Sequence, residues 1–164
     1  ATVKKNLDMA KLLLENKANV NMMDANGDTS LMLAVASKNP DLVKLLFEYG
    51  ANPNISKQDG TTPLIMSISQ KTPEITRLLL DNGANLNSCK SNGETPLMIV
   101  ASLNDLETLR LLLVKNVDVN ARNDNGLSAL TFAARQDHRE IMKLLVNKGA
   151  DTTLISIKSS KDRI

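Results

Sequence analysis

Apolar and polar positions follow a helical pattern along this chain, and the pattern recurs. Adjacent leucines stand at Leu45-Leu46, Leu78-Leu79, Leu111-Leu112 and Leu144-Leu145, each pair 33 residues after the one before. Because residues three or four positions apart share one face of a helix, each pair predicts a helix with one apolar side. We expect these helices to begin near Pro40, Pro73, Leu106 and Arg139, and to end at Gly50, Gly83, Asn116 and Gly149.

A second series of markers keeps the same phase. Gly27, Gly60, Gly93 and Gly126 follow Asn or Asp at intervals of 33, a pairing typical of tight turns because glycine accepts positive φ. Thr62-Pro63 and Thr95-Pro96 then predict helix starts, with the threonine as cap and the proline at the first helical position. This series predicts short first helices over residues 30–37, 63–70, 96–103 and 129–136.

Two independent series with one period predict a repeat architecture, which we expect to form a single domain over residues 1–164. We divide it into full repeats at 24–56, 57–89, 90–122 and 123–155. Leu12-Leu13, Ala18 and Asn19 keep the same phase, so residues 1–23 are expected to be a partial repeat. Residues 156–164 are expected to be a C-terminal tail or a further partial repeat.

These markers resemble those of the ankyrin repeat family, which combine a turn glycine, Thr-Pro-Leu-His-x-Ala, a Leu-Leu helix and Gly-Ala-x-x-Asn. The resemblance implies an all-α repeat solenoid of helix-turn-helix units with β-hairpin loops. The sequence departs from the family at the histidine, which is replaced by Met32, Ile65, Met98 and Thr131. We therefore expect apolar contact in place of polar bonding between neighbouring hairpins.

Composition narrows the function. Twenty basic and 18 acidic residues leave a net charge of +2, and only 2% of residues are aromatic, which argues against nucleic-acid binding. The chain contains no run of 18 apolar residues, so the sequence predicts no membrane span. One cysteine, Cys89, and one histidine, His138, give no triad, no phosphate loop and no metal-ligand spacing. We therefore expect that the protein is not an enzyme and has no catalytic, metal-binding or cofactor-binding residue and no cofactor. We also expect the chain to be a monomer by itself.

The resemblance implies that a protein partner lies along the concave wall of turns and first helices, at positions that differ between repeats. Leu103 and Leu127 are either interface anchors or ordinary surface residues, and Arg122 and Arg135 are either hot spots or solvated charges. We predict that His138 is a surface loop residue. The predicted partner-binding residues are Gln58, Asp59, Thr61, Gln70, Ser91, Asn92, Glu94, Leu103, Arg122, Asp124, Asn125, Leu127, Arg135 and Gln136.

Two functions follow from this interpretation. The chain is either a non-catalytic scaffold or adaptor module of a larger protein, or a self-contained inhibitor or immunity-type protein that occludes a partner enzyme. The start inside a helix favours the module, and the length of the precursor would separate the two. We expect a cytoplasmic location, or an exported or periplasmic one if a leader was removed before Ala1.

Overall fold

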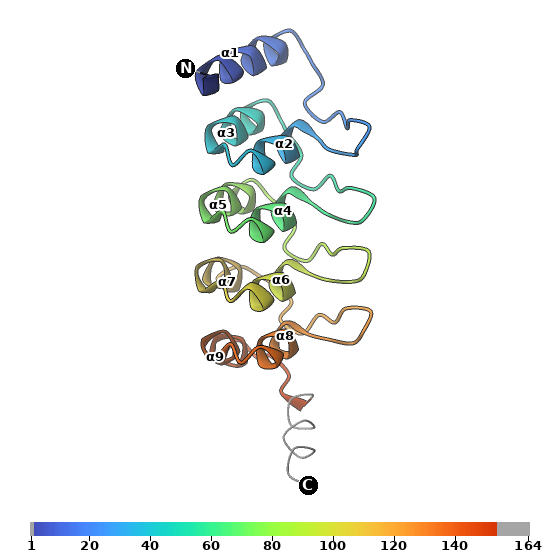
Figure 1. Ribbon diagram of the computed structural model, residues 1–164, viewed down its shortest axis with the longest axis vertical. Coiled ribbons are helices and arrows are strands. Elements are labelled where there is room, and N and C mark those ends of the chain that lie inside the picture. The colour runs from blue at the N-terminus through green and yellow to red at the C-terminus, as the bar shows by residue number, and fades with distance from the viewer. Residues whose placement is uncertain (1, 154–164) are drawn as a thin grey trace. The chain divides into compact units, whose positions relative to one another are not determined.

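The computed structural model describes the backbone of residues 2–153, with side chains from Leu7 onward, and the predicted tail at 156–164 lies outside this range. The chain divides into two compact units, Ala1–Asn85 and Leu86–Ile164. Within the described residues the first unit holds five helices (Figure 1): α1 (Thr2–Glu15), α2 (Ser30–Ala36), α3 (Pro40–Glu48), α4 (Pro63–Ser69) and α5 (Pro73–Asp81). The described part of the second unit holds α6 (Pro96–Leu103), α7 (Leu106–Leu113), α8 (Ala129–Arg135) and α9 (Arg139–Asn147).

The helices pack in pairs. In the first unit α2 packs against α3 and α4 packs against α5, and in the second unit α6 pairs with α7 and α8 with α9. Neighbouring pairs then stack first helix on first helix, as α2 on α4 and α6 on α8. The predicted helices are confirmed, with ends within about three residues of those expected. Between residues 2 and 153 no strand forms, and the loops carry a single antiparallel bridge, Met23 to Thr29.

A hydroxyl residue caps each first helix, as the Thr-Pro pairs predict. Thr29, Thr62 and Thr95 accept a hydrogen bond from the backbone N–H three residues on, and Ser128 does the same for α8. Such caps satisfy backbone donors that have no partner inside the helix. Each second helix has an acidic residue in its first turn, where negative charge suits the helix dipole. These residues are Asp41, Glu74, Glu107 and Glu140.

The loops fold as tight hairpin turns. In the loop around Gly60, the Lys57 N–H donates to Thr61 O at 2.9 Å and the Gly60 N–H donates to Lys57 O at 2.9 Å. The same two hydrogen bonds recur at Gly27, Gly93 and Gly126, each glycine with φ between +72° and +81°. The turn glycines therefore set one backbone shape for all four hairpins.

The core is aliphatic, as the low aromatic content requires. Leu79, Met98 and Leu112 are fully buried, whereas Met66 and Met142 are half-buried. Three of the four residues in place of the family's histidine, Met32, Ile65 and Met98, are also buried, as the expected apolar contact requires. The fourth, Thr131, lies 3.1 Å from the hydroxyl of Ser128.

A recurrent asparagine joins each loop to the next. Asn120 Nδ2 donates to Gly149 O at 3.1 Å, and Asn120 Oδ1 accepts from the Asp151 N–H at 2.8 Å. Asn54 makes the same two bonds, to Gly83 O and from the Asn85 N–H. This side chain therefore pairs with the backbone at the end of the following helix pair.

We predict that Asn120→Ala lowers the free energy of unfolding by about 1 to 3 kcal/mol, since each of its two hydrogen bonds contributes about 0.5 to 1.5 kcal/mol net. Urea unfolding measures the change. Asn125→Ala is the matched control, because Asn125 is exposed and only its backbone N–H takes part in a hydrogen bond. Equal losses in the two variants would contradict a structural role for Asn120.

Candidate protein-binding surface

The predicted partner-binding residues fall on both units, and each unit is described by itself. Gln58, Asp59, Thr61 and Gln70 belong to the first unit. The remaining residues belong to the second unit, where two hairpin turns and the ends of α6 and α8 carry them. The second unit therefore provides most of the candidate surface.

Backbone hydrogen bonds hold the two hairpin turns of the second unit together. The Asp124 N–H donates to Asn92 O at 3.2 Å, which links the second turn directly to the first. Inside the turns, Asn92 Oδ1 accepts from the Glu94 N–H, and the buried Asn123 Oδ1 accepts from the N–H groups of Asn125 and Leu127. The main chain and the side-chain oxygens of these two asparagines thus fix the turn shape.

Several predicted residues of these turns face solvent on that frame. Ser91, Asn92, Asp124 and Asn125 are exposed. Glu94 is half-buried instead, because its carboxylate forms an ion pair with Lys90 Nζ at 3.2 Å. The turns therefore present short polar side chains, with Glu94 partly engaged inside its own loop.

Arg122 lies beside the second turn and is held in place. Its Nη2 is 3.1 Å from Asp151 Oδ2, and its Nη1 donates to Gly126 O at 3.3 Å, while 42% of the side chain stays exposed. Hydrogen bonds from the backbone and side chain of Thr153 hold the pKa of Asp151 below its usual value, and the charge of Arg122 adds a smaller effect. An ordered arginine loses little side-chain freedom when a partner binds it.

The first-helix side of the surface is formed at the ends of α6 and α8. Arg135 and Gln136 are exposed, and Gln136 Nε2 donates to Ser102 Oγ at 3.0 Å. Leu103 and Leu127 are half-buried, so each offers only part of its side chain to a partner. The structure thus leaves a small apolar area between polar groups.

His138 differs from its predicted role. It stands just before α9, is half-buried, and its Nδ1 lies 2.8 Å from Ala101 O on α6. The side chain therefore connects two successive helix pairs of the second unit. This contact has no local sequence signal, because the two residues lie 37 positions apart.

The four predicted residues of the first unit are held more locally. Asp59 and Gln58 are exposed, and both the N–H and the hydroxyl of Thr61 donate to the carboxylate of Asp59. Gln70 follows α4 directly, and its side-chain oxygen is buried without a hydrogen-bond partner. Gln70 and Thr61 are both half-buried and are therefore less accessible than Gln58 and Asp59.

An ion pair joins neighbouring hairpins of the first unit. Lys57 Nζ lies 2.8 Å from Asp28 Oδ2, and this hydrogen bond raises the pKa of Lys57 above its usual value. The expectation of apolar contact in place of polar bonding between hairpins is therefore wrong at this position. The apolar residues that replace the family's histidine are buried in the helices, whereas the turns make polar contacts of their own.

Paired helices with one hairpin loop per pair define a helical repeat protein. A family model described as ankyrin repeats in three copies matches residues 1–90 and also residues 73–156. The chain therefore belongs to the ankyrin repeat family, and the predicted fold class is confirmed. A comparison with curated proteins finds no match. Ankyrin repeat domains are generally protein-binding modules and are typically non-catalytic.

Two further findings concern other kinds of site. Among the described residues, no helix has both the length and the apolar character needed to cross a membrane. Over the same part of the chain, no three His, Cys, Asp or Glu side chains lie where they could share a metal ion. Cys89 is exposed and forms no disulfide.

Proposed function

We propose that this protein is a scaffold or adaptor module that binds a protein partner through its hairpin turns and the ends of its first helices. The observation that supports this proposal best is that, in the second unit, hydrogen-bonded turns form a fixed backbone frame that presents exposed side chains. A rigid frame lowers the entropy cost of binding because the turns are ordered beforehand. This arrangement suits a partner surface, which presents many shallow contacts.

The side chains on the frame differ between repeats while the backbone stays the same. The position two residues before the Thr-Pro proline or its equivalent holds Thr61, Glu94 and Leu127. The position just before the turn glycine of each hairpin holds Asp59, Asn92 and Asn125. Substitution at the first of these positions changes what the surface can contact, while the backbone hydrogen bonds of the turn stay in place.

Arg122, Leu127 and Arg135 are the residues that we expect to contribute most. Arginine is enriched at binding hot spots because its planar group forms several hydrogen bonds while its stem packs against apolar surface. Leu127 supplies a partly exposed apolar contact in the same part of the second unit. The partner that suits this set carries acidic side chains around a small apolar area.

Affinity capture with a triple variant tests this proposal. We expect Arg122→Ala, Leu127→Ala and Arg135→Ala together to reduce capture of the partner by at least about tenfold, which corresponds to about 1.4 kcal/mol. The protein is used as bait, bound proteins are identified by mass spectrometry, and the affinity of a recovered partner is then measured with purified components. Circular dichroism and urea unfolding check that the variant stays folded.

A second triple variant serves as the matched control. Arg77→Ala, Arg110→Ala and Val114→Ala remove the same charge from exposed positions on or just after second helices. We expect this control to keep its affinity. Equal binding by both variants would exclude the proposed surface, and loss of a captured enzyme's activity in the complex would favour the inhibitor over the adaptor.

A further inference from the structure

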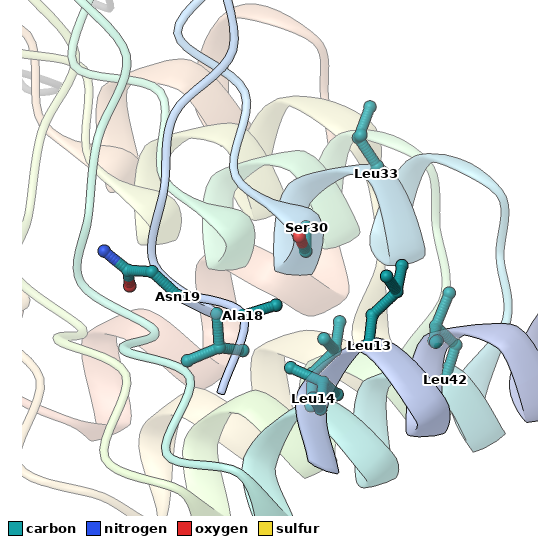
Figure 2. A pocket seen from close by; sticks show the side chains of 10 residues that line it. Leu13, Leu14, Ala18, Asn19, Ser30, Leu33 and Leu42 are labelled. Atoms are coloured by element: carbon teal, nitrogen blue, oxygen red, sulfur yellow. The ribbon is translucent and has the colours of Figure 1, made fainter. Parts of the chain in front are cut away.

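An open apolar groove lies in the first unit beside α1. Its volume is about 250 Å³, and none of its lining residues is charged. Figure 2 shows Leu13 and Leu14 of α1, Ser30 and Leu33 of α2 and Leu42 of α3 around it. The lining residues are Ala10, Leu13, Leu14, Ala18, Asn19, Val20, Ser30, Leu33, Leu42 and Leu46.

The same walls recur one repeat later, where a helix fills the space between them. Adding 33 to the lining residues gives a set that includes Val43, Leu46, Ala51, Pro63 and Leu79, and all five are buried. These residues belong to α3, α4, α5 and the loop after α3, and α2 packs against both α3 and α4. The groove beside α1 therefore corresponds to the seat of a first helix.

The second unit shows the same arrangement. Adding 99 to the lining residues gives Leu109, Leu112, Ala129 and Leu145, which are all buried. Here α6 packs against α7 and α8, the helices that carry the first three of these residues. In both units the space between these walls is thus filled by a short first helix.

Exposure of the groove residues shows what is not covered. Leu13 is 54% exposed, whereas its counterparts Leu46, Leu79, Leu112 and Leu145 are at most 2% exposed. Ser30 is exposed, whereas its counterparts Pro63, Pro96 and Ala129 are buried. The difference concerns the surfaces that a first helix covers elsewhere in the chain.

The residues that open α1 carry the markers of a helix pair rather than of one continuous helix. Lys5-Asn6-Leu7-Asp8 aligns with Lys38-Asn39-Pro40-Asp41, the connection between α2 and α3. In every complete pair the residue at this position takes a left-handed conformation, with φ of +52° to +55°, at Lys38, Lys71, Asn104 and Asp137. Lys5 is the fifth member of this series, although α1 runs through it without a break.

We propose that the groove is the seat of a first helix of this same polypeptide, whose last turn is Thr2–Lys4. In that state Lys5 adopts the left-handed turn and the second helix starts at Leu7, as it does after Asn39 in the next repeat. The occupant is a short helix with an uncharged, small and apolar buried face, like the sequences of α2, α4 and α6. A charged face is excluded because the groove offers no partner for a desolvated charge.

An N-terminal extension tests the seat. Copying the sequence of Lys90–Ile99 in front of Ala1 places the first half of an α6-like helix in register with Thr2–Lys4. The probe is the rate at which a maleimide labels Ser30→Cys in a Cys89→Ser background. We expect the extension to slow labelling at least about tenfold and to raise the urea midpoint, because the helix covers Ser30.

The control extension carries lysine in place of the copied Leu97 and Met98. We expect it to leave both the labelling rate and the urea midpoint unchanged. Equal protection by the two extensions, or no protection by either, would overturn the proposal. Protection that depends on protein concentration would assign the groove to a second copy and would also overturn it.

The sign of a substitution at Lys5 gives an independent test of the turn. In the chain of residues 1–164, where α1 is continuous, Lys5→Ala should have a higher urea midpoint than Lys5→Gly, because alanine favours a helix interior. In the extended chain the order should reverse, because glycine accepts positive φ at lower cost. An unchanged order in the extended chain would exclude the left-handed turn.

Discussion

Replacing Leu79 by alanine is expected to lower the free energy of unfolding by about 2 to 5 kcal/mol, the range for large-to-small substitutions in a packed core. Leu79 is fully buried on α5, which packs against both α3 and α4. Its removal therefore leaves a cavity at the point where two helix pairs of the first unit meet. Urea unfolding followed by circular dichroism measures the loss.

Leu12→Ala is the matched control for this prediction. The substitution is chemically the same and also lies in a second-helix sequence, but Leu12 is 55% exposed on α1. We expect its loss to stay below about 1 kcal/mol, since a half-exposed leucine removes little apolar surface from water. Comparable losses for Leu12→Ala and Leu79→Ala would mean that the assigned core register is wrong.

The helices could be predicted from the sequence because their signals are local. The leucine pairs fix the buried face, and Thr62-Pro63 and Thr95-Pro96 mark helix starts within a few residues of the helix itself. The turns between paired helices have no such local signal. Their left-handed residues are Lys38, Lys71, Asn104 and Asp137, none of them glycine, so only the common period reveals them.

The candidate surface could be predicted only as a set of positions. Thr61, Glu94 and Leu127 occupy one position of the repeat, yet the contacts that decide their accessibility come from elsewhere in the loop or the fold. Glu94 is drawn into an ion pair with Lys90, and Arg122 is held by Asp151, 29 residues away. The contact between Arg122 and Asp151 joins two repeats and has no sequence signal within either of them.

The second large effect is expected at a turn glycine. Gly93 has φ of +75°, and a Cβ atom built there would lie 2.9 Å from Asn123 Cα and 3.0 Å from Asp124 N. These contacts are with backbone, so the neighbouring turn would have to move as a whole. We predict that Gly93→Ala lowers the free energy of unfolding by about 2 to 5 kcal/mol, the sum of about 1 to 2 for the left-handed conformation and about 1 to 3 for overpacking.

Gly126→Ala separates these two contributions. Gly126 has nearly the same φ, +72°, but a Cβ there meets no atom within 4 Å. We expect Gly126→Ala to lose only the conformational part, about 1 to 2 kcal/mol, in the same urea measurement. Equal losses at the two glycines would mean that the turns of the second unit are not in close contact.

The contact between the two turns of the second unit also determines how the candidate surface is built. The Asp124 N–H reaches Asn92 O directly beside Gly93, so main-chain contact sets the spacing of the two turns. Because their side chains take no part in that contact, Ser91 and Asn125 can change identity without moving the turns. If so, Gly93→Ala should weaken partner capture more than Asn125→Ala does, since it displaces the whole frame and not one contact.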